Sequence, residues 1–575
     1  MGLAGPFAAQ AQVASTPRPF VEEQRQQERE RALREQNERA VDVRRPAGPP
    51  AAGQRLPEAE SPCFRIDRIR LVGEHSDAFQ WALAAMSEAA DGVADAPLGR
   101  CLGTEGVNIV LARVQQALVA RGWVTTRVLV GPQDLASGEL VLTLIPGRIA
   151  AIRLADASGT TTEASLGVRM AIPAAPGDLL NLRDIEQGLE NLKRLPTAEA
   201  DIRIAPSNAA DARAGDSDLV VQYRQGRADL PLPLRANLSY DDSGTEATGR
   251  NQGGLTLAWD GPLHLNDLFY LSLNHDVFNH AGQGTSGNTV HYSIPWGNWL
   301  FSTTASEGRY WQSVAGLAQN YTYSGYSSNA ELRVARMLYR DQHRKTSASL
   351  RAWQRTSHNY IDDTEVGVQR RLVGGWELGL AHREFIGTAT LDGNLAYRRG
   401  TGAFGAIPAP EEAFGEGTSR MKLVTADLNF NQPFELGGQR LRYAGLWRAQ
   451  WNGTPLTPQD RFAIGGRFTV RGFDGEASLM GDRGWLVRND IGWALPAEVL
   501  GTPLGAELYL GVDYGQVNGP SAERLVGKRL AGAVIGLRGA VRGLSYDFFV
   551  GMPISRPEGF HTSSWTTGFS LNYGF

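Results

Sequence analysis

The chain has 575 residues, and its 57 Lys and Arg against 61 Asp and Glu give a formal net charge of −4. This length exceeds one ordinary domain, and the balanced charge excludes a global attraction to nucleic acid or anionic lipid. The 67 glycines, a mean hydropathy of −0.28 and the absence of any apolar run of roughly 18 residues argue against a bundle of transmembrane helices.

The N-terminus, MGLAGPFAAQAQ, is a short apolar stretch ending in Ala9-Gln10-Ala11, a pattern that signal peptidase accepts. We interpret residues 1–11 as a signal-peptide remnant whose true start lies upstream, and the alternative is a disordered tail. Export would bring the only two cysteines, Cys63 and Cys101, into an oxidising periplasm. We therefore expect a disulfide between them, with two buried thiols as the alternative.

Residues 12–40 contain a segment rich in Glu, Gln, Arg and Ala, which predicts a helix over about 18–40. Glu30 and Arg34 stand at the favourable i,i+4 spacing. The segment has almost no apolar stripe, so this helix is either solvated or lies in a polar cavity. Residues 41–62 follow as a proline-rich, extended linker.

Two small units of the same β-α-α-β-β type are predicted next, over residues 63–147 and 148–227. In the first, an apolar helical face runs through Val107, Val110, Leu111, Val114 and Leu118. In the second, a helix begins near Arg183 with Asn181 as its N-cap. Each unit has an edge strand to spare.

From about Leu230 onward, helical periodicity disappears and apolar residues alternate with polar ones. In the last segment Trp565, Phe569 and Tyr573 share one face, while Gly568 and Asn572 share the other. One face suits lipid and the other water. Residues 228–575, at roughly 20 to 22 per strand and connection, predict a membrane all-β barrel of about 16 antiparallel strands, which leaves no exposed edge in the bilayer. The alternative is a large soluble β-protein.

The same alternation predicts which side chains enter the barrel lumen between residues 505 and 516. Glu507, Gly511, Asp513 and Gly515 fall on the lumenal face. A carboxylate there needs water or a cation, and the glycines leave room for another backbone to approach. Arg471, in the turn-rich stretch 455–481, is a plausible partner if that stretch folds inward. Alternation alone does not choose Arg471 over another arginine.

Two short motifs resemble known signatures, and this resemblance selects Arg471 as the partner of the lumenal carboxylate. Val470-Arg471-Gly472-Phe473, followed by the G-x-D-x-G pattern of Gly511, Asp513 and Gly515, resembles the paired signatures of the outer-membrane insertase and transporter superfamily. With two POTRA-like units, an N-terminal helix and a linker, nearly the whole mature chain resembles the TpsB-type transporters of two-partner secretion. This branch includes exporters of filamentous haemagglutinin and of haemolysins.

The resemblance implies a role for each of these parts in a Gram-negative outer membrane. The loop 455–481 folds into the barrel so that Arg471 pairs with Asp513. The helix of residues 12–40 occupies the pore at rest and withdraws to the periplasm. The POTRA-like units receive an unfolded secreted exoprotein, an adhesin, haemolysin or contact-dependent toxin, by strand addition. The barrel contacts outer-membrane lipid, and the terminal Phe575 is the signal read by the barrel-assembly machinery.

Export is expected without ATP, because Gly527-Lys528 is followed by Arg529 and no P-loop occurs. No G-x-S-x-G or H-E-x-x-H motif is present, so we expect no catalytic residue, no cofactor and no metal site. We expect a monomer that does not bind nucleic acid. The alternative function is an outer-membrane β-barrel assembly foldase, which would share Arg471 and Asp513.

Overall fold

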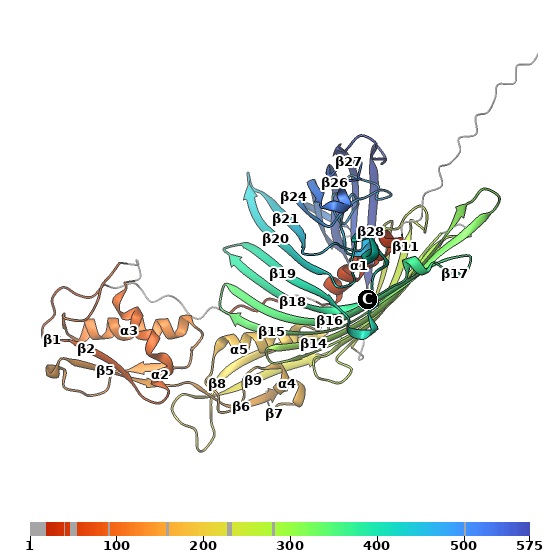
Figure 1. The fold of residues 1–575 in the computed structure, drawn as a ribbon. Helices are drawn as coiled ribbons and strands as arrows, with labels where there is room; N and C mark the ends of the chain where they lie inside the picture. The colour runs from red at the N-terminus through yellow and green to blue at the C-terminus, as the bar shows by residue number, and fades with distance from the viewer. Residues whose placement is uncertain are drawn as a thin grey trace, which may run out of the picture.

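The computed structural model describes residues 19–38, 41–45, 55–89, 93–156, 160–226, 233–278, 282–499 and 502–575. Figure 1 shows a large barrel with two small domains arranged in series at one mouth and helix α1 (Pro19–Asn37) inside it. The expected signal-peptide remnant, residues 1–11, lies outside the described residues. We call the mouth beside the two small domains the near mouth, and the opposite one the far mouth.

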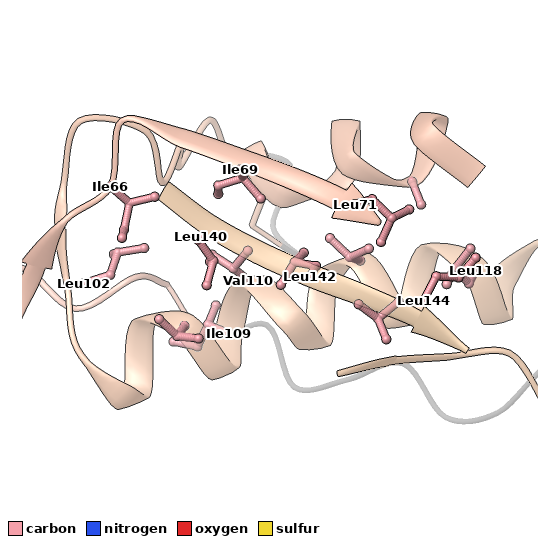
Figure 2. Packing of buried hydrophobic residues seen from close by; sticks show 14 of the residues in the cluster. Ile66, Ile69, Leu71, Leu102, Ile109, Val110, Leu118, Leu140, Leu142 and Leu144 are labelled. Atoms are coloured by element: carbon pink, nitrogen blue, oxygen red, sulfur yellow. The ribbon is translucent and has the colours of Figure 1, made fainter. Parts of the chain in front are cut away.

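The first POTRA-like unit packs its helices against a three-stranded sheet of order β2-β5-β4. Buried residues Ile69, Leu71, Val110, Leu140 and Leu142 form the centre of this core (Figure 2). Cys63 and Cys101 form a disulfide next to the paired strands β1 and β3. The elements of this unit are β1 (Phe64–Arg65), β2 (Arg68–Val72), α2 (Ser76–Phe79), η1 (Gln80–Ser87), β3 (Cys101–Leu102), α3 (Thr104–Ala120), β4 (Arg127–Leu129), η2 (Leu135–Ser137) and β5 (Glu139–Ile145).

The second unit has a four-stranded sheet of order β7-β6-β9-β8. The expected N-cap is confirmed, because the Asn181 side chain accepts a hydrogen bond from the Arg183 amide. Ile185, Leu189 and Leu192 are buried against the sheet. The elements are β6 (Arg148–Ala155), β7 (Thr161–Glu163), α4 (Leu166–Ala171), α5 (Leu182–Lys193), β8 (Ala198–Pro206) and β9 (Asp216–Gln225).

The barrel is closed by sixteen long antiparallel strands, because β28 pairs with β10. The expected number of strands is confirmed. The strands are β10 (Leu234–Asp241), β11 (Gln252–Asp260), β12 (Leu268–Asp276), β13 (Gly284–Trp296), β14 (Trp299–Ala315), β15 (Asn320–Arg340), β16 (Arg344–Ile361), β18 (Arg371–Ile386), β19 (Ala389–Thr401), β20 (Lys422–Leu436), β21 (Gln439–Asn452), β24 (Arg483–Val499), β25 (Thr502–Asn518), β26 (Arg529–Val541), β27 (Leu544–Ser555) and β28 (Thr566–Gly574). The two-residue β17 (Thr364–Glu365) extends the β16–β18 hairpin.

The second unit rests directly on the near mouth. Asn191 of α5 donates to the Gly297 carbonyl in the β13–β14 turn at 2.7 Å. Arg194 donates to the Ser293 hydroxyl at 2.8 Å. These contacts orient α5 beneath the lumen.

Among the described residues, no helix is both long enough and apolar enough to cross a membrane.

Candidate functional site: the barrel lumen

Side chains on β25 alternate between lipid and lumen, which follows from the two-residue period of a strand. Leu510 is exposed on the outer face, with 57% of its surface accessible, whereas Asp513 is 1% exposed and points inward. Glu507 and Tyr509 face the same interior, where they contact Arg538. Glu507 and Asp513, which alternation placed on the lumenal face of this strand, lie on that face in the structure.

The loop 455–481, between β21 and β24, folds back into the barrel from the far mouth. It carries the short hairpin of β22 (Phe462–Ile464) and β23 (Leu479–Gly481). Its residues Val470 and Phe473 are 0% and 3% exposed, and they pack in an apolar cluster with Phe560 and Leu530. An apolar core therefore holds this loop against the wall, in addition to its charged contacts.

Arg471 is buried between two carboxylates of the barrel wall. Its Nε donates to Asp513 Oδ2 at 2.7 Å and its Nη2 to Asp513 Oδ1 at 2.7 Å, a bidentate contact. Nη2 also donates to Oδ1 of Asp490 on β24 at 2.5 Å. The backbone amide of Arg471 donates to Asp513 Oδ2 as well. All three side chains are at most 10% exposed.

The network continues along the wall. Arg538 of β26 contacts both Asp490 and Glu507, and Arg442 of β21 makes a bidentate contact with Glu507. Arg442 faces the lumen as part of this network. Since each carboxylate has at least two guanidinium contacts, no charge in this sector is buried without a partner.

Glycines make the close fit of the loop possible. A Cβ at Gly511 would lie 2.6 Å from the Arg471 Nη2 atom, and one at Gly515 would lie 2.8 Å from a Val470 methyl. Side chains of the loop therefore occupy the space that we expected another backbone to fill. The loop backbone instead approaches Gly532, where a Cβ would lie 1.9 Å from the Arg471 carbonyl oxygen. Gly472, with φ +94, adopts a conformation that favours glycine.

Helix α1 spans much of the lumen, since its 19 residues are about 28 Å long. Its far end contacts β16 and the β10–β11 turn, where Ser357 donates to Glu23 at 2.6 Å and Thr248 to Glu22 at 3.0 Å. Near its other end, Arg34 forms an ion pair with Glu331 of β15 at 2.5 Å. The contacts of α1 described here are polar, as the expected lack of an apolar stripe requires.

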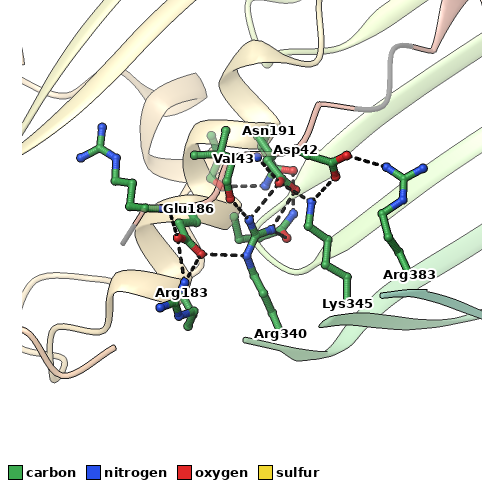
Figure 3. Close-up of polar contacts among 12 residues, drawn as sticks. Asp42, Val43, Arg183, Glu186, Asn191, Arg340, Lys345 and Arg383 are labelled. Atoms are coloured by element: carbon green, nitrogen blue, oxygen red, sulfur yellow. Dashed lines mark hydrogen bonds and ion pairs between the residues drawn. The ribbon is translucent and has the colours of Figure 1, made fainter. Parts of the chain in front are cut away.

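The linker residues that follow α1 are clasped between the barrel and α5 (Figure 3). Arg340, at the end of β15 and 5% exposed, donates to Glu190 Oε2 at 2.8 Å and to the Val43 carbonyl at 2.5 Å. Asp42 accepts from Lys345 and from Arg383, both at 2.7 Å. We name Asp42–Arg45, with these barrel and α5 partners, the linker clasp.

The linker clasp also covers part of the second unit. The Val43 amide donates to Glu190 and the Arg45 amide to Glu186, both on α5. The Arg45 guanidinium reaches the Ile202 carbonyl and Asp201 on β8, an edge strand of that sheet. Residues 43–45 thus bridge α5 and an edge of the sheet.

One ionisable group near this junction has a shifted pKa. Burial, together with the nearby Asp178 carboxylate, raises the pKa of Asp184 to about 6, and the Arg340 guanidinium opposes this rise. Asp184 lies in the first turn of α5, outside the membrane-spanning strands. The ionised carboxylate of Asp184 therefore lowers the stability of the folded state slightly at neutral pH.

Sequence reasoning paired Arg471 with one carboxylate and missed the second, Asp490. The register places Asp490 opposite Gly511 and Arg488 opposite Asp513. Alternation along β24 could have put Asp490 on the lumenal face, but it does not show which loop side chain reaches it. Within the described ranges, no group of three or more His, Cys, Asp or Glu side chains is placed to hold a metal ion.

The closed barrel, its two POTRA-like units and its occupied lumen define a class, the POTRA-bearing barrels of the outer membrane. A family model described as haemolysin secretion/activation protein ShlB/FhaC/HecB matches residues 215–539. Two POTRA-domain models match residues 64–147 and 148–206.

Relatives and solved structures agree with this match. The chain is 38% identical to the outer membrane transporter CdiB-2 of Burkholderia pseudomallei, over 99% of this chain and 97% of that protein. The structure of CdiB from Acinetobacter baumannii superposes with a TM-score of 0.81 at 30% identity, over 97% of this chain and 98% of that one. CdiB from Escherichia coli, 24% identical, shares the fold with a TM-score of 0.83 over 97% of this chain and 99% of that one.

The chain belongs to the ShlB/FhaC/HecB family. It is an outer-membrane transporter of two-partner secretion, and its POTRA domains lie in the periplasm. The near mouth therefore faces the periplasm and the far mouth the cell exterior. The resemblance found in the sequence is confirmed, and transport is favoured over barrel assembly.

Proposed function

We propose that this transporter exports a single secreted exoprotein, of the adhesin, haemolysin or contact-dependent toxin class, through the lumen that α1 occupies at rest. The polar character of α1 carries this proposal. A helix held by hydrogen bonds and ion pairs can move into water without exposing an apolar face. The lumen can therefore be emptied without unfolding the barrel.

The division of labour follows the parts of the chain. Residues 12–40 act as the plug and 41–62 as its tether, while residues 63–147 and 148–227 receive the partner. Residues 228–575 form the barrel and include the inward loop 455–481. The exported chain moves without ATP or any chemical step of the transporter, and its folding outside the cell prevents return.

Arrival of the exoprotein is coupled to release of α1 through the linker clasp. A partner segment that adds to the edge strand β8 must compete with Arg45, which contacts the Ile202 carbonyl there. Displacing Arg45 also loosens Val43 and Asp42, the linker residues that follow α1. Recognition at the periplasmic domain would then free the plug.

Two further roles are proposed for the barrel itself. One copy suffices for a complete pore, because β28 and β10 of the same chain close it, so the transporter acts as a monomer. The terminal Phe575, 53% exposed and paired through its backbone with Ala236, is the residue that the barrel-assembly machinery reads.

Secretion of the N-terminal fragment of the partner exoprotein tests the proposal. We expect wild type to secrete the fragment, and Arg471→Ala at matched outer-membrane abundance to lose at least about 90% of this export. Arg440→Ala removes an arginine that is 83% exposed and should export normally. Normal export by Arg471→Ala would reduce that residue to a structural role. If even the wild type exports nothing, and barrel proteins are misassembled when the gene is deleted, the results would favour a foldase.

A further inference from the structure

Three basic side chains lie together at the far end of β19 and β20. Arg399, close to the end of β19, stands directly opposite Lys422, the first residue of β20. Arg420 lies in the turn before Lys422, and a Cβ atom at Gly402, just past β19, would lie 3.9 Å from its Nη2 atom. We name Arg399, Arg420 and Lys422 the exterior basic cluster, because the far mouth faces the cell exterior.

Arg399 and Lys422 point to the outside of the barrel. Leu395 of β19 is 49% exposed on the lipid-facing side, and Leu428 of β20 is 39% exposed there. Each leucine is an even number of residues from the cation on its strand, so the two share a face. The alternate positions face the lumen instead, where Arg398 lines a cavity beside α1.

The length of β20 places this cluster at the level of the lipid headgroups. Its 15 residues, at a strand tilt of about 40°, rise about 35 Å along the membrane normal. The apolar band of such a barrel is only about 25 Å tall. Lys422, at the end of the strand, therefore lies outside the hydrocarbon.

Aromatic side chains mark the same level. Trp376 of β18 is the neighbour of Arg399 across the strands, and it contacts Tyr397 edge-on with ring centroids 5.6 Å apart. Trp451 of the neighbouring strand β21 is 46% exposed. Tryptophan and tyrosine gather at the boundary between hydrocarbon and headgroups. Arg399 and Lys422 thus stand at the polar edge of the lipid-facing surface.

The exterior basic cluster has no acidic partner among the residues that the structure describes. No carboxylate in those ranges lies within ion-pair distance of Arg399, Arg420 or Lys422. Like charges directly opposite each other across two strands destabilise a sheet. In the lumen the next pair of strands avoids this cost, because Arg448 of β21 contacts Asp427 of β20 at 2.8 Å. An anion from outside the chain would remove the repulsion.

We propose that the exterior basic cluster binds the phosphate groups of a phosphorylated glycolipid in the outer leaflet. Phosphate oxygens accept charge-assisted hydrogen bonds from guanidinium and ammonium groups, and one phosphate accepts several. The acyl chains of the same lipid would lie along Leu395 and Leu428, below the cluster. This apolar contact favours a lipid over free phosphate. The inference concerns the surrounding membrane and does not depend on which exoprotein is exported.

Native mass spectrometry of the detergent-solubilised full-length protein, titrated with lipid A that carries both phosphates, tests the proposal. We expect the double variant Arg399→Gln, Lys422→Gln to bind at least about tenfold more weakly than wild type. Lipid A without phosphates should lose a similar factor with the wild type. Lys422→Arg keeps the charge and should bind as the wild type does. Arg524→Gln is the matched control, because Arg524 is also at the far mouth, is 90% exposed and lies 3.9 Å from Glu416.

Several outcomes would overturn the proposal. These are an unchanged affinity in the double variant, equal binding of phosphate-free lipid A, or an equal loss in Arg524→Gln. Inorganic phosphate that displaces lipid A at equal concentration would indicate a free-anion site and contradict the assignment to a lipid.

The stability of the barrel without added lipid separates binding from a structural role. The double variant removes the like-charge pair, so its unfolding temperature in detergent should equal or exceed that of the wild type. Added lipid A should raise the unfolding temperature of the wild type more than that of the variant. A lower temperature for the variant without lipid would assign these cations to the fold and contradict the proposal.

Discussion

The barrel lumen holds two different occupants, the inward loop 455–481 and helix α1. The loop buries Val470 and Phe473 in an apolar cluster and places Arg471 between two carboxylates. The helix makes hydrogen bonds and ion pairs, and one of its faces remains exposed to water. Both occupants fill space in the lumen, but only the loop packs apolar side chains against the barrel wall.

This difference separates a permanent part of the pore from a removable one. Moving the loop would expose apolar side chains, at about 1.5–3 kcal/mol for each one fully buried, and would leave two carboxylates without their arginine. Moving α1 exchanges polar contacts with protein for polar contacts with water, at about 0.5–1.5 kcal/mol each. The pore can therefore open by losing the helix while the loop stays.

Asp513→Asn should produce the largest effect, because Asp513 accepts three hydrogen bonds from Arg471. We expect a loss of about 3–5 kcal/mol, seen as a lower temperature for unfolding of the barrel in heat-modifiability gels. Asp490→Asn, which weakens a two-bond contact, should cost less. Equal losses in both variants would show that the bidentate contact is not the main anchor.

Arg340→Ala should break the linker clasp with the next largest effect. It leaves Glu186, which is 0% exposed, and Glu190 with fewer cationic partners, at about 2–4 kcal/mol. We expect faster proteolysis of the linker. We also expect faster hydrogen exchange in α5, because the second POTRA domain moves more freely. Arg344→Ala, which removes an exposed partner of Glu384, is the control. Unchanged protection in α5 would contradict the role of the clasp.

Arg34→Ala should loosen α1 and leave the loop in place. The Arg34–Glu331 pair is partly buried, so its loss should raise the population with α1 displaced by roughly tenfold, or about 1–2 kcal/mol. A disulfide between Gln26→Cys and Ser327→Cys, whose native side chains meet at 3.1 Å, measures the seated helix. We expect slower trapping in Arg34→Ala. An unchanged trapping rate, together with a lower unfolding temperature of the barrel, would show that this ion pair stabilises the barrel wall and does not hold α1.

Asp184→Asn should give the smallest effect and depend on pH. The pKa of Asp184 in the folded state is about 6, above its ordinary value, so the folded form binds more protons between pH 4 and 6. Stability of the wild type should therefore fall as the pH rises through this window. The variant lacks this loss and should gain about 1 kcal/mol at pH 7, with no gain at pH 4. Scanning fluorimetry of the full-length protein at both values measures it, and equal gains at both would contradict it.

Periodicity along the chain was sufficient for much of the architecture. Alternating residues such as Leu510 and Asp513 predicted the barrel and its lumenal face, and Asn181 predicted the start of α5. The polar composition of residues 18–40 predicted a helix unsuited to an apolar core, and the structure has it at Pro19–Asn37. These features depend on neighbours within a few positions, so the order of residues contains them.

Only the tertiary structure decided which distant residues meet. The register of β24 and β25 brings Asp490 beside Asp513, and the folding of the loop brings Arg471 to both. Likewise, the linker clasp joins Asp42 and Val43 to barrel side chains about 300 residues away, with no local pattern to connect them. Local periodicity determines which way a side chain points, whereas strand pairing and loop packing determine what it meets.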